Sequence, residues 1–245
     1  MGNRYKACNI KVQDNSVAII GWEEGHAGRI ETWLEKVHNY HIACFINPSD
    51  TPLDIDTNKI KRDVSQFSYP TENEFKNKPL LNTSQWANYL KDIGINKVLV
   101  TTDDPLERYK EISYAKKNNL ELINAIHPTA YLMTDVLIKK NVILHEHSYI
   151  GYRTELYDGV IIDGAHLGHH NVIKDCSEIV TGAVLGGNVT IGKFSRVYVG
   201  ATIINRIQVG DNSIVGAGSI VSSNVIDNSV VAQKPGKMIF RRNKV

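Results

Sequence analysis

The 245-residue sequence is short of cysteine, of long apolar runs and of net charge. Its three cysteines, Cys8, Cys44 and Cys176, follow no known spacing, so neither a disulfide framework nor a cysteine-bound zinc ion is expected. The net charge of +2 gives no reason to expect a nucleic-acid partner. No apolar stretch approaches the roughly 20 residues of a membrane span, and the first residues lack a signal-peptide core. We therefore expect a cytoplasmic protein without a membrane partner.

A six-residue repeat fills the chain from His127 to about Ile226. A large aliphatic residue recurs at every sixth position, and a small or compact residue stands two positions before nearly every one. A period of six excludes an amphipathic helix, which repeats at 3.6, and a half-buried strand, which alternates. It is typical of a solenoid in which three hexads close one triangular coil of 18 residues. The aliphatic positions are Leu132, Ile138, Leu144, Ile150, Leu156, Ile162, Leu167, Ile173, Ile179, Leu185, Ile191, Val197, Ile203, Val209, Val215 and Val221.

The repeat slips once, because Ile162 and Leu167 are only five residues apart. This predicts that one corner, around Asp163 and Gly164, is one residue short, and glycine suits such a tightened turn. Away from the slip, residues 18 apart in sequence are expected to be neighbours in successive coils.

The first half of the chain alternates predicted strands and helices, which indicates a small, mostly parallel α/β domain. A strand over residues 16–21 runs into a glycine-rich turn and a helix, and a second strand follows at 41–46. Such a turn offers backbone N–H groups to an anion such as a phosphate, but it also lets a helix pack closely on a strand. Its spacing is not the dinucleotide fingerprint. The residues of interest in the turn are Gly21, Gly25, His26 and Gly28.

The remaining elements of this half follow in order. Residues 48–82 are polar and contain four prolines, and we expect a surface excursion, either an ordinary loop or a lid. The patterns then predict a helix, a strand, a second helix and a last strand, over residues 84–93, 97–102, 105–118 and 120–126. We expect two domains, residues 1–126 and residues 127–245.

The order of these parts resembles one family closely. A Gly-His-containing first turn is followed by His-Pro-Thr-Ala, by the hexapeptide repeat, by Val-Gly-Ala-Gly-Ser-Ile-Val and by Lys-Pro-Gly-Lys-Met-Ile. This resembles the bacterial sugar-nucleotide N-acetyltransferases of surface-glycan synthesis, a group that includes sialic-acid O-acetyltransferase-like proteins. The resemblance implies an N-terminal Rossmann-like α/β domain that binds a nucleotide-linked amino sugar. It also implies a left-handed parallel β-helix, assembled as a homotrimer, with acetyl-CoA between adjacent solenoids and no metal.

The same resemblance places the catalytic histidine at His169. The acidic residue that usually follows that histidine is His170 here, and a second histidine nine positions on is Glu178. These three are the expected catalytic residues, and Gly186, Gly187 and Asn188 are expected to bind acetyl-CoA.

The chemistry of the corner agrees with this placement. A histidine with a pKa near 6.5 suits the removal of a proton from an amine nucleophile at neutral pH. The 18-residue spacing of the coils places Gly187 next to His169 in the following coil. There its backbone N–H can point at the thioester oxygen as negative charge develops. His170 either orients His169 or is a solvated corner residue. Glu178 lies about half a coil away and, if it acts, is expected to act on a neighbouring subunit's site.

Other residues have simpler interpretations. His166 precedes an inward aliphatic residue and should face outward. His145, Glu146 and His147 are expected to form a charged, exposed turn, and their spacing is not that of a metal site. On the acceptor side, the family uses the Gly-His turn and acidic residues after the second strand. Asn47 stands in their place here, so we expect Gly21, Gly25, His26, Gly28 and Asn47 to bind the nucleotide-linked sugar.

Three other functions compete with the leading one. Zinc carbonic-anhydrase-like hexapeptide proteins share the solenoid but have no need of the first domain. A non-catalytic binding protein would explain the departures at His170 and Glu178. O-acetylation of a free sugar is the nearest variant, and the α/β domain argues against it.

Replacement of His169 tests the leading hypothesis. His169→Ala or His169→Asn is expected to lower turnover by roughly 10²–10⁴-fold, the usual contribution of a positioned general base. Steady-state acetyl transfer by the folded variant is the measurement. Near-normal turnover would remove His169 from the mechanism.

Overall fold

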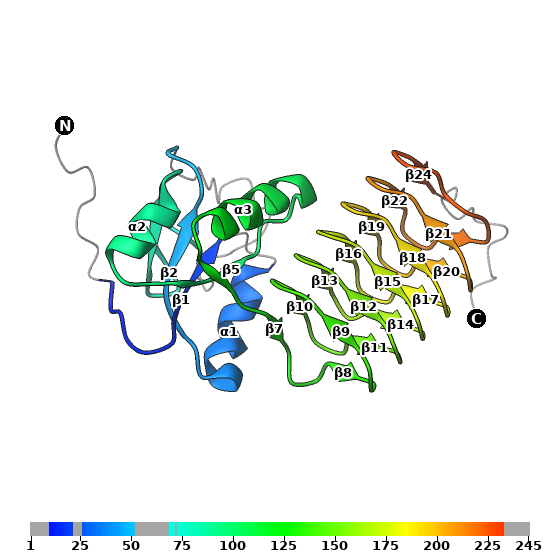
Figure 1. Cartoon of the computed structure of the whole chain (residues 1–245), viewed down its shortest axis with the longest axis horizontal. Helices are drawn as coiled ribbons and strands as arrows, with labels where there is room; N and C mark the ends of the chain where they lie inside the picture. The colour runs from blue at the N-terminus through cyan, green and yellow to red at the C-terminus, as the bar shows by residue number, and fades with distance from the viewer. Residues whose placement is uncertain (1–9, 22–25, 52–68, 72, 233–245) are drawn as a thin grey trace, which may run out of the picture.

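The computed structural model describes residues 10–21, 26–51, 69–71 and 73–232. An α/β domain lies at one end of a long three-sided β-helix, and the chain passes once from the first part into the second (Figure 1). None of the helices in these ranges combines the length and the apolar character that a membrane crossing requires.

The α/β domain is built on a six-stranded sheet of order β3-β4-β2-β1-β5-β6. Only β3 runs antiparallel to its neighbour. The five parallel strands, counted along the chain, lie in the order 3-2-1-4-5, which is a doubly wound arrangement with its switch point between β1 and β5. The strands are β1 (Ser16–Ile20), β2 (His41–Asn47), β3 (Glu74–Phe75), β4 (Lys78–Asn82), β5 (Lys97–Val100) and β6 (Glu121–Leu122).

Three helices flank this sheet: α1 (Ala27–His38), α2 (Trp86–Asp92) and α3 (Pro105–Lys117). The buried face of α1 includes Ile30, Trp33 and Leu34, whereas Val37 is 41% exposed. The start of α3 follows from its sequence, because the Asp104 carboxylate accepts hydrogen bonds from two N–H groups of the first turn.

Two predictions for this domain were wrong. The stretch predicted as a loop between β2 and α2 contains β3 and β4, and β4 extends the main sheet beside β2. Phe75 and Leu80 are buried there, and their two short apolar segments were hidden by polar neighbours. Residues 52–68 and 72 of this stretch lie outside the described residues, so the lid hypothesis stays a prediction. The strand predicted over 120–126 is two strands, β6 in the first sheet and β7 (Ala125–Ile126) in the solenoid.

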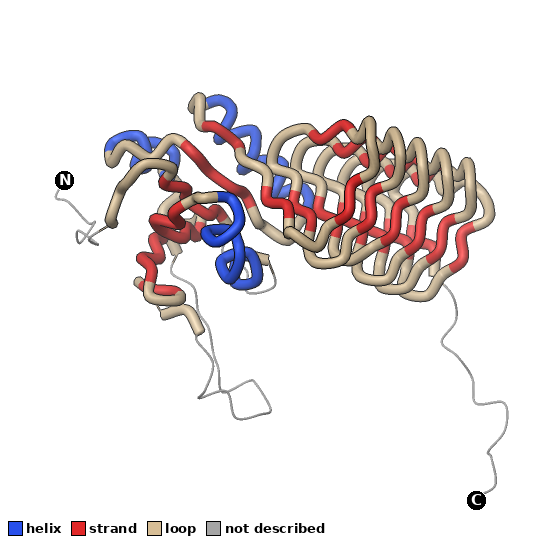
Figure 2. Tube along the Cα trace, turned by 90° about the horizontal axis from the view of Figure 1, so that it is seen from below, coloured by secondary structure: helices blue, strands red, loops and turns tan. Residues whose placement is uncertain are grey.

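The solenoid is a parallel β-helix with two-residue strands on three faces, which fits the left-handed solenoid expected from the hexads (Figure 2). The first solenoid sheet runs from β7 through β10 (Ile143–Leu144), β13 (Ile161–Ile162), β16 (Glu178–Ile179), β19 (Arg196–Val197), β22 (Ile214–Val215) and β24 (Val230–Val231). The second comprises β8 (Tyr131–Leu132), β11 (Tyr149–Ile150), β14 (His166–Leu167), β17 (Val184–Leu185), β20 (Thr202–Ile203) and β23 (Ile220–Val221). The third comprises β9 (Leu137–Ile138), β12 (Glu155–Leu156), β15 (Val172–Ile173), β18 (Thr190–Ile191) and β21 (Gln208–Val209).

The register of the coils confirms the 18-residue spacing and its slip as far as the last described coil, where the spacing is wrong because Ile214 pairs with Val230, 16 residues on. Ile143 pairs with Ile161, 18 residues on, whereas Tyr149 pairs with His166, 17 residues on, across the short corner. Gly164 in that corner has φ +58°, the left-handed conformation that glycine accepts without strain.

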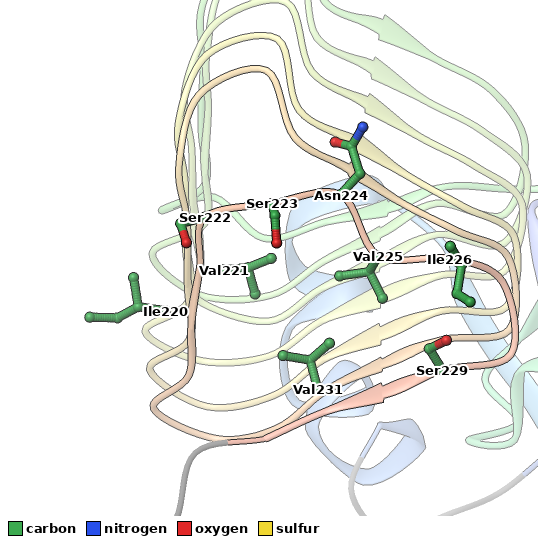
Figure 3. Close-up of a pocket in the computed structure, with 9 residues that line it drawn as sticks. All are labelled: Ile220, Val221, Ser222, Ser223, Asn224, Val225, Ile226, Ser229 and Val231. Carbon is green, nitrogen blue, oxygen red and sulfur yellow. The ribbon is translucent and has the colours of Figure 1, made fainter.

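The apolar interior of the solenoid reaches its C-terminal end. The aliphatic position of every hexad points inward into one continuous core. The last described coil leaves a cavity of about 310 Å³ into which Val221, Val225 and Val231 point (Figure 3).

The corners of the solenoid carry a second repeat beside that of the aliphatic residues. Residues in the left-handed conformation recur every six positions, three before the aliphatic residue. Asparagine and glycine dominate these positions because they tolerate positive φ best. One of them is His170, with φ +58°. The others beyond residue 130 include Asp135, Asn141, His147, Arg153, Gly159, Cys176, Gly182, Asn188, Phe194, Gly200, Arg206, Asn212 and Gly218.

Buried polar contacts join the two parts of the chain. The side chain of Asn141, which is fully buried, donates to the carbonyl of Val100 at 2.8 Å and accepts from the N–H of Val100 at 2.7 Å, as a strand neighbour would. Arg108 of α3, also fully buried, donates to the carbonyls of Gly159 and Cys176 in the solenoid. Ile143 and Ile161 pack with α1 in one apolar cluster. The α/β domain therefore covers the start of the first solenoid sheet.

Replacement of Asn141 tests this junction. Asn141→Ala leaves the N–H and C=O of Val100 without these partners, and because an unsatisfied buried polar group costs about 1–3 kcal/mol, we expect the free energy of unfolding to fall by about 2–4 kcal/mol. Chemical denaturation measures the loss. The control is Asn212→Ala, since Asn212 shares the left-handed conformation but is exposed, and it should lose about 1 kcal/mol. Equal losses would show that the junction does not depend on Asn141.

Candidate functional site

His169 and His170 lie together at the corner between β14 and β15. Their Nδ1 atoms are 2.9 Å apart, and the two rings are almost perpendicular. This contact needs one N–H, and with the proton on Nδ1 of His169 the Nε2 of that ring is left as the basic nitrogen. Both residues are exposed. The structure thus brings His170 into contact with the expected base, as the orienting alternative for His170 requires, while leaving it exposed at the corner.

Gly186, Gly187 and Asn188 form the same corner one coil later. The carbonyl of His169 accepts from the N–H of Asn188 at 2.8 Å, so the two turns are bonded directly. A Cβ on Gly187 would lie 2.4 Å from Cε1 and 2.5 Å from Nε2 of the His169 ring. Glycine is therefore required here because the imidazole of His169 lies over it. The stacking of Gly187 on His169 that the 18-residue spacing predicts is confirmed.

The backbone N–H of Gly187 already has an acceptor within the chain. It donates to Oδ1 of Asn205 at 2.9 Å, and a Cβ on Gly186 would lie 2.1 Å from the same oxygen. The expected oxyanion donor is thus occupied by a side chain from the next coil. Asn205 is 18 residues after Gly187, so the 18-residue spacing of the coils is the signal that identifies it.

Glu178 is not brought together with His169. It belongs to β16, in the first sheet, and points away from the core toward the α/β domain of its own chain. Its side chain is 8% exposed, with Oε2 3.3 Å from Nε of Arg196 and Oε1 3.8 Å from Nε2 of His26. The expectation that it reaches a neighbouring subunit does not fit this burial within one chain.

The residues expected on the acceptor side lie near the carboxyl ends of β1 and β2, except for Gly25, which is outside the described residues. Gly21 directly follows β1 with φ +77°, and a Cβ there would lie 2.7 Å from the backbone nitrogen of Thr102, so the close approach of the chain after β1 to the chain after β5 requires glycine. Gly28 lies inside α1, where a Cβ would make an ordinary contact with Phe75. Asn47 uses both amide hydrogens internally, on Thr51 and on Asn82.

His26 precedes α1 and is buried between the two parts of the chain. Its Nδ1 is 3.0 Å from Nε2 of His145, and the two rings are stacked. On its other side, Nε2 is 3.6 Å from Oδ1 of Asp103, which follows β5 at the switch point. His145 is fully buried, so the interpretation of residues 145–147 as an exposed turn is wrong at its first residue, because α1 covers it. His147 is exposed as expected.

Charged contacts surround this pair. Arg29 of α1 forms a bidentate salt bridge with Asp163, with both N–O distances 2.9 Å, and contacts the Glu146 carboxylate at 2.5 Å. The contact of Asp103 with His26, helped by Arg196, holds the pKa of that carboxyl well below its usual range. Burial lowers the pKa of His145 to about 3, so this ring is neutral at physiological pH.

His26, Asp103 and Glu178 offer one ligand atom each within 4.8 Å of one another, which is the spacing of a metal site. The guanidinium of Arg196 already contacts both carboxylates. A divalent cation would therefore meet a fixed positive charge, and the donor set fits an ionic network between domains better than a metal centre.

Comparison with known proteins gives the fold. No protein-family model matches the chain, and no curated protein matches it in sequence. A mutant of GDP-perosamine N-acetyltransferase from Caulobacter crescentus, solved in complex with CoA and GDP-perosamine, is 23% identical, with a TM-score of 0.77 over 93% of this chain and 98% of that chain. The acetyltransferase domain of PglB from Neisseria gonorrhoeae FA1090, in complex with acetyl coenzyme A, is 22% identical, with a TM-score of 0.74 over 92% and 99%. The chain shares the fold of these structures over more than nine tenths of its length.

The neutral His145 makes stability depend on pH. Its pKa is about 3 when folded and about 6.5 when unfolded, so the unfolded chain binds the extra proton and stability is lost as pH falls below about 6.5. The slope should approach about 1.4 kcal/mol per pH unit, and His145→Gln should flatten it. Denaturation at several pH values measures both slopes. His147→Gln, at the exposed histidine, should keep the wild-type slope, and an unchanged slope in His145→Gln would contradict the assignment.

Proposed function

We propose that this protein transfers the acetyl group of acetyl-CoA to the amino group of a nucleotide-linked amino sugar in bacterial surface-glycan synthesis. The observation that carries the proposal is the packing of the His169 imidazole over Gly187 at an exposed solenoid corner. A base and a backbone N–H are thereby adjacent at one place. The neighbours of this fold support the ligands, because they were solved with CoA and GDP-perosamine or with acetyl coenzyme A.

The reaction needs a general base and an oxyanion donor at this corner. Nε2 of His169 takes a proton from the amine, whose nitrogen attacks the thioester carbonyl, and the CoA thiolate leaves with the electrons of the broken C–S bond. The N–H of Gly187 stabilises the negative charge that develops on the carbonyl oxygen. His170 holds the His169 ring through the contact between their Nδ1 atoms. Gly186 and Asn188 line the place for the thioester arm.

We assign the acceptor to the α/β domain, residues 1–126, as a Rossmann-like unit, and acyl transfer to residues 127–245 as a left-handed β-helix. The doubly wound strand order supports this, because such sheets bind ligands outside the carboxyl ends of their strands at the switch point. Gly21 and His26 lie between β1 and α1 at that point and Gly28 lies in the first turn of α1. Gly25, which stands between them in the sequence, is assigned to the acceptor with them. Asn47 ends the neighbouring strand and would have to release an internal contact to reach the nucleotide.

We also propose that the chain assembles as a homotrimer through the second solenoid sheet. The outward residues of this sheet are largely apolar or aromatic, and the rings of Tyr131, Tyr149 and His166 stack in series along it. Tyr131, Val184 and Ile220 are 60%, 42% and 63% exposed in the single chain. The His169 corner borders this face, so a second copy packed there would wall the acetyl-CoA groove.

A panel of nucleotide-linked amino sugars, incubated with acetyl-CoA, tests the function. We expect stoichiometric release of free thiol with at least one member, no loss of activity with a zinc chelator, and sedimentation of the protein as a trimer. His170→Ala should lower turnover by roughly tenfold or more, less than loss of the base itself. No thiol release with any sugar, together with no CoA-induced rise in melting temperature, would overturn the proposal in favour of a binding protein. Chelator-sensitive activity would favour a zinc enzyme.

A further inference from the structure

The N–H assigned to the thioester oxygen is bonded to a side chain in the ligand-free protein. Oδ1 of Asn205 lies 2.9 Å from the nitrogen of Gly187, at the place where a ligand carbonyl would accept the same hydrogen. The oxygen also lies over Gly186, where only a glycine leaves it room. Asn205 is exposed, so its side chain has space to turn away.

The same contact occurs at a neighbouring corner that carries no chemistry. Oδ1 of Asp211 accepts from the N–H of Lys193 at 2.8 Å, again from 18 residues further along the chain. Backbone bonds from the following residue to the same two turns also match, with Arg206 donating to Gly187 and Asn212 to Lys193. A side chain that accepts an N–H of the previous coil is therefore a general device of this solenoid, and only at Gly187 does it engage a catalytic group.

We propose that Asn205 is a positioning residue of the acetyl-CoA site that competes with the thioester oxygen for the N–H of Gly187. This rests on the proposed function. In the free protein the Asn205 amide holds the Gly187 N–H in its direction of use. When acetyl-CoA binds, the side chain turns toward solvent and the thioester oxygen takes its place. Acetyl-CoA is thus bound more weakly than the corner would otherwise allow, whereas CoA, which has no acyl oxygen, does not need the exchange.

The test compares two ligands by calorimetry: CoA and S-acetonyl-CoA, a stable thioether that keeps a carbonyl in the acyl position. The quantity is the ratio of their dissociation constants, CoA over acetonyl-CoA. Asn205→Ala should raise this ratio about 2- to 10-fold, since one net hydrogen bond is no longer displaced. Asn205→Asp should lower it, because a carboxylate accepts the N–H more strongly. Repulsion between that carboxylate and the CoA phosphates cancels in the ratio.

Asp211→Ala is the matched control. It removes the same kind of contact one corner away and should leave the ratio at its wild-type value. A purely structural role for Asn205 would change melting temperature in both alanine variants and the ratio in neither, and that result would overturn the proposal. A fall in kcat of Asn205→Ala with an unchanged ratio would also overturn it, because Asn205 would then act in the transition state.

The outcomes separate this inference from the proposed function. If the wild-type protein binds both ligands and turns over acetyl-CoA, but the ratio of dissociation constants is the same in the variants at position 205, only the proposed role of Asn205 is wrong. If the wild-type protein binds neither ligand, the acetyl-CoA site itself is refuted and Asn205 with it.

Discussion

Backbone hydrogen bonding between successive coils is the constraint on which the rest of the structure depends. Each two-residue strand is too short to be stable alone, and it gains its partners only from the coils before and after it. This pairing fixes residues 18 apart as neighbours, or 17 across the short corner and 16 in the last described coil. His169 meets Gly187 for this reason, and Gly187 meets Asn205 for the same one. The site is therefore a consequence of register rather than of a flexible loop.

The second constraint is the polar junction between the α/β domain and the solenoid. Arg108, Asn141 and the His26 network satisfy buried groups on both sides, and each lost partner would leave a buried polar atom unpaired. Such a junction holds the carboxyl ends of β1 and β5 against a fixed face of the solenoid. An acceptor held by one part and an acyl donor held by the other can then be brought to one orientation, which is how positioning contributes to rate.

Much of this architecture could be predicted from the sequence, because the geometry of a solenoid follows from the period of its sequence repeat. The inward residues, the slip near Gly164 and the stacking of Gly187 on His169 all followed from counting in sixes. β3 and β4 were missed because two and five residues among polar neighbours carry almost no periodic signal. The burial of His145 and Glu178 could not be predicted, since it depends on which solenoid face the α/β domain covers. No local pattern in the sequence encodes that choice. Arg29 and Arg196, which contact Glu146 and Glu178 in the structure, have no role that the sequence alone would suggest.

The proposed acceptor site shows the same limit. Turn glycines and strand ends place Gly21, His26 and Asn47 near one edge of the sheet, but their partners decide what they can do. Asn47 donates its amide hydrogens to Thr51 and Asn82, and His26 faces another histidine and two carboxylates. Residue type at a sheet edge thus suggests a place for a ligand but does not identify the atoms that would hold it.

In the proposed reaction, one solenoid corner holds both the base and the oxyanion donor of an acyl transfer. An experimental structure of the protein with S-acetonyl-CoA measures this directly. We expect the acetonyl oxygen within hydrogen-bond distance of the Gly187 nitrogen, the adjoining carbon facing the His169 ring, and the Asn205 side chain turned away. A ligand bound with its carbonyl at another corner, or a Gly187 N–H still held by Asn205 beside a bound ligand, would contradict it.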